Sequence, residues 1–400
     1  MLSGIRVSLF LASRAILRGG RIGTLLNILI IAMVFTNMIL LSAIIGGAVN
    51  LFHEQTVDYI TSDIVIKPDQ DERTILNVDE LLERVNRVPG VSRASARYAL
   101  GATLGYKGSS VSIPITAFNP RDEVEVTRIH TRVIEGDFLS PGDDGILLGQ
   151  LVAGHEDSGL DFYDSLGGVA VGDSITVMYA NGVSREYRIK GLFSTKSYQA
   201  DYMAFISWEE MNAVLGTRNT GATEVLVRTV SGEDPLVVKM RLLTFGVQER
   251  VETWEEAMTQ IIADSMETFS IIDRISLAVS LIIAIVVIGI VFTIKTINQR
   301  RQIGIQKAIG ISNRIIIGSY VAQVLFIWLF GSLAGMVVVN LLLFYFSANP
   351  LEFPDGDVVP VFEMATMLEN VAWLAAASAL AGFLPAWRIT RENTLDAMRG

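Results

Sequence analysis

Four long stretches of the chain contain no charged residue, and they define its organisation: Ile22–Phe52, Ile275–Ile294, Ile315–Leu351 and Asn370–Trp387. About 20 apolar residues in a helix cross the roughly 30 Å hydrocarbon core of a membrane. A charge at the centre of such a span costs roughly 2.5–3.5 kcal/mol, so charge-free stretches of this length predict transmembrane helices. The pattern predicts one early span, a long polar block, and three spans that close the chain.

The polar block between the first two spans has the patterns of a mixed α/β domain. Residues 62–68 are typical of a short strand that ends at a proline. Asn77, with Glu80 three residues later, predicts a capped helix start. Asn181-Gly182 stands between two alternating stretches, which is the strongest short signal for a β-hairpin. Asp234-Pro235 predicts a further helix that continues to Leu243.

Two segments predict helices that extend beyond the membrane. Residues 254–272 form an amphipathic pattern that runs into the second span without Pro or Gly. The first charge-free stretch has 31 residues, or about 46 Å of helix, which is longer than a bilayer needs. A cleaved signal peptide is the alternative for this stretch, because Gly46, Gly47 and Ala48 are small. Its length argues against cleavage, since signal-peptide cores have about 7–15 residues.

The charges beside the spans predict their orientation. Residues 1–21 contain four arginines, and residues 295–314 contain three arginines and two lysines, with no acidic residue in either segment. The charged residues of the loop between the third and fourth spans are all acidic. Positive-inside bias therefore places both termini and residues 295–314 in the cytoplasm of a cell membrane, and the large block outside. The segment 2–18 is amphipathic and suits the lipid interface.

The predicted fold is a membrane protein with four transmembrane helices and a large α/β extracytoplasmic domain between helices 1 and 2. Its parts are an N-terminal amphipathic cytoplasmic segment (1–21), transmembrane helix 1 (22–51), the extracytoplasmic domain with stalk helices (52–274), transmembrane helix 2 (275–297), a cytoplasmic loop (298–314), transmembrane helix 3 (315–347), an extracytoplasmic loop (348–365), transmembrane helix 4 (366–387) and a cytoplasmic tail (388–400).

Composition and motifs exclude several classes of function. The block 52–274 carries 20 basic and 35 acidic residues, so it is not a nucleic-acid surface. The chain has no cysteine and no Gly-Lys dipeptide, so it has neither thiolate metal sites nor a P-loop for ATP. His53-Glu54 and His155-Glu156 begin like a zinc-protease motif, but Val57 and Gly159 occupy the position of the second histidine.

Two short segments are candidates for helix or partner contacts. In residues 298–314, apolar side chains at helical spacing lie beside basic ones, which predicts an amphipathic helix on a partner protein, or else a solvated basic loop near lipid. In the third span, Gly331 and Gly335 form a small-xxx-small pattern. This pattern indicates either helix packing within one copy or a dimer contact.

At this point the sequence resembles a known family, the MacB/FtsX-like (type VII) ABC transporter permeases. These include macrolide exporters, lipoprotein-release permeases and glycolipid exporters. The motifs that carry the resemblance are Asn298–Gly310, the C-terminal Leu384–Arg399, and four segments of the block: Gly136–Leu139, Gly145–Ala153, Val171–Val177 and Lys190–Phe193. Gln302, Gln323 and Thr394 depart from the family pattern, which commonly has Glu, Glu and Pro there.

The resemblance implies a permease subunit that is not itself an enzyme. It implies a separate dimeric ATPase that binds ATP and Mg, a second permease copy or a homologous permease, and contact with membrane lipid; an extracytoplasmic adaptor is a further candidate partner. No cofactor is expected in this chain. The residues expected to couple to the ATPase are Arg301, Gln302, Ile303, Gly304, Ile305, Lys307, Ala308 and Gly310.

Three functions follow as hypotheses. The first is export or extraction of a lipid, lipopeptide or drug-like substrate, driven by force transmitted across the membrane. The alternative is an FtsX-like transmitter that regulates an extracytoplasmic hydrolase, although a block of about 220 residues favours the exporter type. The third, a membrane-anchored enzyme, lacks a catalytic constellation in the sequence.

Overall fold

The computed structural model describes residues 7–8, 10–14, 21–69, 72–154, 164–257, 260–353, 356–362 and 364–390. The chain divides into two compact units. The helical unit comprises Met1–Asn50, Asp264–Leu351 and Val358–Gly400, and the α/β unit comprises Leu51–Ala263 and Glu352–Asp357.

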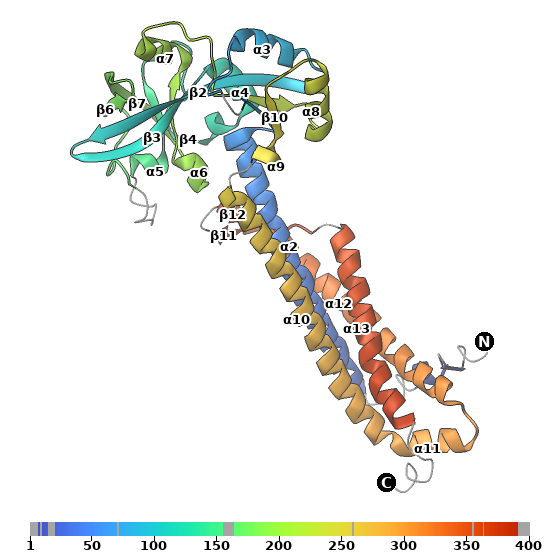
Figure 1. Cartoon of the computed structure of the whole chain (residues 1–400). Coiled ribbons are helices and arrows are strands. Elements are labelled where there is room, and N and C mark those ends of the chain that lie inside the picture. The colour runs from blue at the N-terminus through green and yellow to red at the C-terminus, as the bar shows by residue number, and fades with distance from the viewer. Residues whose placement is uncertain are drawn as a thin grey trace. The chain divides into compact units, whose positions relative to one another are not determined.

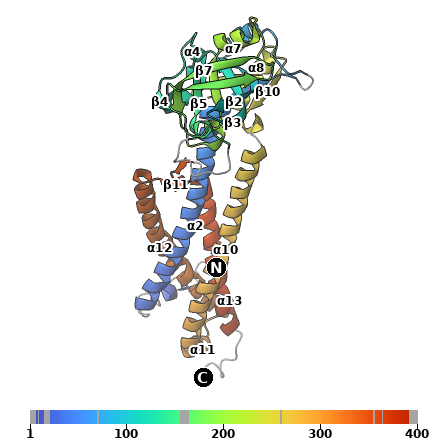
Figure 2. The same ribbon diagram turned by 90° about the vertical axis from the view of Figure 1, so that its left-hand side faces the viewer.

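Among the described residues, four helices are long and apolar enough to cross a membrane, and an α/β domain lies between the first and second of them, as the sequence predicts. They are α2 (Arg21–Gln55), α10 (Gln260–Asn298), α12 (Asn313–Ala348) and α13 (Met364–Thr390), shown in Figures 1 and 2. The candidate spans within or around them are Gly23–Thr61, Glu267–Asn298, Asn313–Ala348 and Met364–Thr390. A short helix, α11 (Arg300–Ala308), joins α10 to α12.

Glycines bring the helices of the helical unit close together. A methyl group built on Gly331 would lie 2.7 Å from Ile31 Cγ2, and one on Gly335 would lie 2.7 Å from Phe35 Cδ1. The small-xxx-small pattern of α12 therefore packs against α2 of the same chain, which is one of the two alternatives that the sequence left open. Gly382 of α13 meets Val324 of α12 in the same way.

The small residues of α2 that suggested a cleavage site also have a packing role. The segment before α13 lies across α2, where the Val361 N–H donates to the Ala43 carbonyl at 2.9 Å. A methyl group on Gly47 would clash with the Val359 carbonyl oxygen. Gly46 and Gly47 thus allow this backbone to approach the helix. Before this segment, two short strands pair with each other, β11 (Leu351–Phe353) and β12 (Gly356–Val358), which the sequence analysis did not predict.

The α/β unit is built on a sheet of ten strands in the order β10-β1-β9-β2-β3-β8-β5-β7-β4, with β6 between β2 and β7. The strands are β1 (Ile64–Lys67), β2 (Val91–Tyr106), β3 (Ser109–Phe118), β4 (Val133–Gly136), β5 (Ile146–Gly149), β6 (Ser174–Tyr179), β7 (Ser184–Phe193), β8 (Ala204–Ser207), β9 (Glu224–Thr229) and β10 (Arg250–Thr253). Because β6 pairs with both β2 and β7, six strands form a closed circuit around one apolar core.

Short helices connect and cover these strands. They are α3 (Val78–Asn86), α4 (Pro120–Val126), η2 (Ile129–Arg132), α5 (Gln150–Ala153), α6 (Tyr198–Asp201), α7 (Trp208–Leu215), α8 (Pro235–Thr244) and α9 (Trp254–Ala257). Helices α3 and α8 cover one face of the β10-β1-β9-β2 part and form a second core with it.

Several local predictions are confirmed. The β6–β7 hairpin turns at Asn181-Gly182, where the Asn181 side chain accepts from Val183 N at 3.0 Å. Helix α8 begins after Asp234, whose side chain accepts from Leu236 N at 2.9 Å.

One local prediction needs correction. Asn77 precedes α3, but it adopts a left-handed backbone (φ 53°) and its side chain makes no capping hydrogen bond. The prediction for residues 254–272 is confirmed where they are described, since they are helical in α9 and from Gln260 onward.

Candidate functional site

Helix α11 contains most of the residues predicted to contact a partner. Its inner face is buried against the rest of the helical unit, since Ile303 is only 2% exposed and packs into the apolar core of the helices. Gly304 beside it is also buried. These two residues therefore pack within the chain, and their expected role in coupling to the ATPase stays a prediction.

The outer face of α11 remains open in this chain. Arg301, Gln302 and Ala308 are exposed, Ile305 is 46% exposed, and Ile309 directly after the helix is 74% exposed. Removing an apolar side chain from water is favourable. A face that exposes apolar side chains beside polar and charged ones therefore has the composition of a docking surface. These five residues are hereafter the α11 outer face. Its role stays a prediction.

Lys307 and Gly310 belong to the ends of helices rather than to this face. The Lys307 ammonium donates to the Thr390 carbonyl at 3.0 Å, so it caps the C-terminus of α13, where the helix dipole favours a cation. Gly310 has φ 93°, and Ile311 N donates to the Gln306 carbonyl at 3.0 Å. This is the geometry that ends a helix with a left-handed glycine.

Polar contacts also fix the helices that flank α11. The Lys295 ammonium of α10 donates to Gln323 Oε1 of α12 at 2.7 Å, and the Tyr320 hydroxyl donates to Gln299 Oε1 at 2.8 Å. The first bond joins α10 to α12, and the second joins Gln299, the residue before α11, to α12. Helix α11 itself contacts the helical unit through buried Ile303 and through the Lys307 cap of α13.

The N-terminal segment also reaches the helical unit. The Ser8 hydroxyl donates to the Ile315 carbonyl at 3.1 Å, and Ala12 is 4% exposed. Ala12 thus lies on the packed side, as its place in the amphipathic pattern predicts. The other apolar residues of that pattern (Leu2, Ile5, Leu9 and Ile16) lie outside the described residues, as does the tail after Thr390.

A second site of interest lies in the α/β unit, where the chain passes from α2 into the sheet. The α-helix ends at Gln55 and continues as a six-residue π-helix, η1 (Thr56–Thr61). π-Helical turns are rare in proteins, and those that occur are often found at functional sites. Ser62 follows with φ 56° and ψ −165°, a conformation that is nearly restricted to glycine, and it is fully buried.

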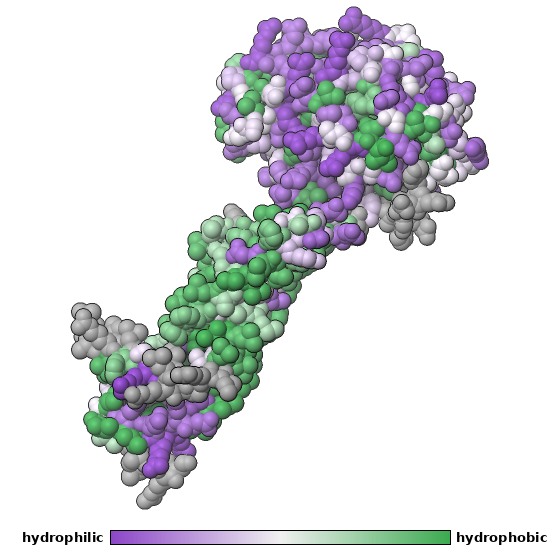
Figure 3. Space-filling view, turned by 180° about the vertical axis from the view of Figure 1, so that it is seen from behind, coloured by the Kyte–Doolittle hydropathy of each residue, from purple (hydrophilic) through white to green (hydrophobic). Residues whose placement is uncertain are grey.

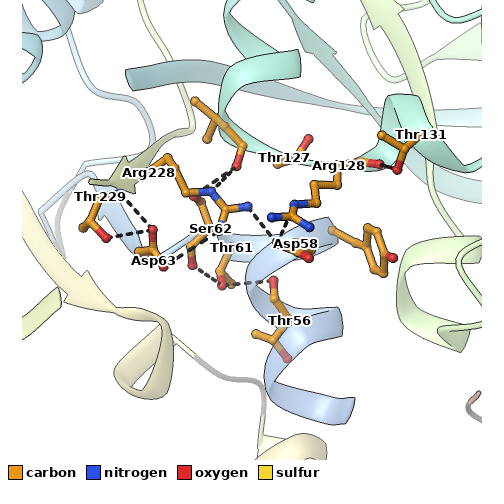
Figure 4. Close-up of polar contacts among 12 residues, drawn as sticks. Thr56, Asp58, Thr61, Ser62, Asp63, Thr127, Arg128, Thr131, Arg228 and Thr229 are labelled. Atoms are coloured by element: carbon orange, nitrogen blue, oxygen red, sulfur yellow. Dashed lines mark hydrogen bonds and ion pairs between the residues drawn. The ribbon is translucent and has the colours of Figure 1, made fainter. Parts of the chain in front are cut away.

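Charged groups hold this turn against the sheet (Figure 4). Arg228 of β9 pairs with Asp58 Oδ1 at 2.9 Å, and its Nε donates to the Val126 carbonyl at 3.0 Å. Asp63 accepts from the backbone and the hydroxyl of Thr229 at 2.8 and 3.0 Å. The Ser62 hydroxyl donates to the Val126 carbonyl at 3.2 Å, which offsets part of the backbone strain.

A buried ion pair lies behind the turn. Arg97 of β2 is 2% exposed and binds Glu123 Oε1 at 2.5 Å, while its Nη1 donates to the Ile60 carbonyl of η1 at 2.9 Å. Burial by itself lowers the pKa of the Arg97 guanidinium, but Glu123 and Glu224 outweigh burial and raise this pKa. Burial raises the pKa of the Glu224 carboxyl, and Arg97 opposes that effect.

The sequence analysis did not find this junction. Its residues are far apart in the chain, since Asp58 and Arg228 are separated by 170 positions. Asp58 and Arg128 also contact each other, with the Arg128 N–H donating to the Asp58 carbonyl at 2.8 Å. The local signal for the junction is the group of Thr and Asp residues at positions 56–63, directly after the first long helix.

The described residues hold no group of three or more His, Asp or Glu side chains that could bind a metal ion. His53 packs against the ring of Trp254, with 4.3 Å between ring centroids. His155 and Glu156 lie outside the described residues.

Comparison with protein families assigns both parts of the chain. Residues 24–244 match the MacB-like periplasmic core domain, and residues 274–394 match the FtsX-like permease C-terminal model. The chain belongs to the MacB/FtsX-like permease superfamily. The permeases of this superfamily are subunits of ABC transporters and are generally not enzymes themselves.

Solved structures that are similar to this permease include three that each match about half of this chain. One is the extracellular domain of the noncanonic ABC-type transporter YknZ from Gram-positive bacteria (13% identity, 48% of this chain and 97% of that one, TM-score 0.34). Another is the periplasmic region of MacB from Actinobacillus actinomycetemcomitans (8%, 51% and 91%, TM-score 0.35). The third is a domain of a putative permease protein from Porphyromonas gingivalis (18%, 47% and 87%, TM-score 0.31). No match was found among curated proteins.

Proposed function

We propose that this permease couples ATP hydrolysis by a separate ATPase to a change in its α/β domain, and that it thereby exports or extracts a lipid, lipopeptide or drug-like substrate. Two ATPase subunits would bind ATP and Mg, and two permease copies would complete the transporter. Both termini and α11 would lie in the cytoplasm, and the α/β domain outside the cell membrane.

The observation that carries this proposal is the arrangement of α11. One face of α11 packs through Ile303 into the apolar core of the helical unit, and Lys307 caps α13, while the α11 outer face offers apolar and basic side chains to a partner. A partner that changes shape as it hydrolyses ATP would press on α11 and thereby move the helices that α11 contacts. The absence of acidic residues from positions 295–314 supports a cytoplasmic location for it.

Transmission at the other end would use the junction of α2 with the sheet. The η1 turn is fixed to β2 and β9 by Arg97 and Arg228, so motion of this part of α2 would reach the strands directly. Export by such movement needs no substrate path through the helices. This fits the charge-free spans, which offer no proton or ion relay.

Topology is the first test, and the chain suits it because it contains no cysteine. Single cysteines at the exposed positions Ser184 and Glu352 should react with an impermeant thiol reagent in intact cells. A cysteine at Gln302 should react only after the membrane is opened. If only the Gln302 variant reacts in intact cells, the orientation is the reverse of the predicted one and the proposal is wrong.

Energy supply is the second test. The chain purified from its native membrane should bring an ATPase subunit with it, and after removal of that subunit it should hydrolyse no ATP. ATP turnover by the isolated permease would contradict the proposed division of labour.

A further inference from the structure

A groove of about 910 Å³ lies between α10 and α13, near α11. Apolar side chains line most of its length, among them Ile285 and Ile297 of α10 and Leu384 of α13. Gly289 forms part of its floor, and a methyl group built there would meet no atom within 4 Å. The glycine therefore leaves room that another molecule can occupy.

The end of the groove near α11 is basic. Arg300, the first residue of α11, and Arg388, in the last turn of α13, both line it. None of the described residues that line the groove is acidic. Trp387 lies beside Arg388 and is 39% exposed, as is common for tryptophan at the boundary between lipid and water.

This combination matches one class of ligand. Guanidinium groups bind phosphate oxygens through paired hydrogen bonds, and an apolar groove along a membrane-spanning helix suits an acyl chain. Basic pockets between transmembrane helices are known as sites for anionic lipid headgroups. On the face of the helical unit that Figure 3 shows, hydrophobic side chains cover most of the helices and hydrophilic ones gather at one end.

Other occupants fit less well. A cationic amphiphile would meet two arginines and no described carboxylate in the groove. A second copy of the chain, in a symmetric contact through this groove, would bring the same arginines toward each other.

We propose that the groove between α10 and α13 binds an anionic phospholipid, with its phosphate between Arg300 and Arg388 and one acyl chain beside Gly289. The inference needs only that α10 and α13 span a membrane, so it is independent of the proposed ATPase and of the transported substrate. Because Arg300 begins α11, the bound headgroup would also join α11 to the end of α13.

The test compares lipid retention by the purified full-length chain in native mass spectrometry. The chain is exchanged into detergent with phosphatidylglycerol or phosphatidylcholine of identical acyl chains. We expect one phosphatidylglycerol to be retained in preference to phosphatidylcholine. A basic residue near a lipid headgroup contributes about fivefold to affinity, so Arg300→Gln with Arg388→Gln should reduce retention by about 25-fold.

Two further variants separate a lipid site from a simple anion site. Gly289→Leu fills the groove without touching the arginines, and it should also abolish retention, whereas the neighbouring exposed change Ile290→Leu should not. Arg314→Gln, which removes a charge outside the groove, should leave retention unchanged. Equal retention of both lipids by the unmodified chain would overturn the proposal. Loss in the arginine variant but not in Gly289→Leu would also overturn it, since the site would then hold only an anion. Thermal unfolding of each variant confirms that it is folded.

Discussion

The helical unit and the α/β unit fix their key segments by different means. In the helical unit, α12 meets α2 through Gly331 and Gly335, and α11 is held by the buried Ile303 side chain and by the Lys307 ammonium, which donates to the Thr390 carbonyl. In the α/β unit, η1 is fixed by buried or half-buried charges that each have a specific partner.

The difference follows from the surroundings of each unit. Helices in lipid gain little from the hydrophobic effect, so close contact through small residues is the main source of packing energy. Such contacts change gradually when helices shift. A buried ion pair resists any displacement, because loss of one partner leaves an uncompensated charge. We therefore expect the helix contacts of the helical unit to adjust more readily than the junction of α2 with the sheet.

Removing the buried carboxylate should have the largest effect. Glu123→Gln leaves the Arg97 guanidinium with only Glu224, at 3.8 Å, as a charged partner. We expect the free energy of unfolding of the α/β unit to fall by about 3–5 kcal/mol. Thermal unfolding of the full chain, followed by circular dichroism, measures this effect.

The matched control for this variant is Glu233→Gln, which breaks a half-exposed pair with Arg241. Its cost should be below about 1 kcal/mol. Equal effects of the two substitutions would show that the buried pair does not anchor η1.

A methyl group in the helix contact should have an intermediate effect. Gly331→Ala places a carbon 2.7 Å from Ile31 Cγ2, so α2 and α12 must separate. Overpacking of this kind costs about 1–3 kcal/mol. The control is Gly23→Ala in α2, because a methyl group built on Gly23 meets no atom within 4 Å. This change should be neutral or stabilising. Unfolding in detergent distinguishes them, and equal stability of the two variants would refute the close contact.

The smallest effect should come from the strained residue at the end of η1. Ser62→Ala keeps the left-handed backbone and loses the hydrogen bond to Val126, whereas Ser62→Gly loses the same bond but relieves the strain. The glycine variant should therefore be more stable than the alanine variant by about 1–2 kcal/mol. If the alanine variant is the more stable one, the backbone at Ser62 carries no strain.

Much of this fold could be predicted from local patterns. The charge-free stretches indicated the four spans, and Asn181-Gly182 and Asp234-Pro235 indicated a hairpin and a helix start, because each signal lies within a few residues. The π-turn could not be predicted, since its partners Arg97 and Arg228 come from distant strands. The segment of α11 was predicted correctly as a helix. Its apolar pattern could not reveal that Ile303 packs within its own chain, because sequence does not distinguish an internal apolar face from a docking face.

The most direct test of the account is the α11 outer face. In the reconstituted pair of permease and ATPase, Ile305→Asp should weaken binding at least tenfold and abolish stimulated ATP turnover. An apolar side chain of this size contributes roughly 1.5–3 kcal/mol when buried, and a charge in its place would be unpaired. Gln302→Glu adds the same charge to the same face and should have a mild effect, since the related permeases commonly carry Glu there. Normal binding and normal turnover with Ile305→Asp would show that the ATPase docks elsewhere and would contradict the proposed coupling.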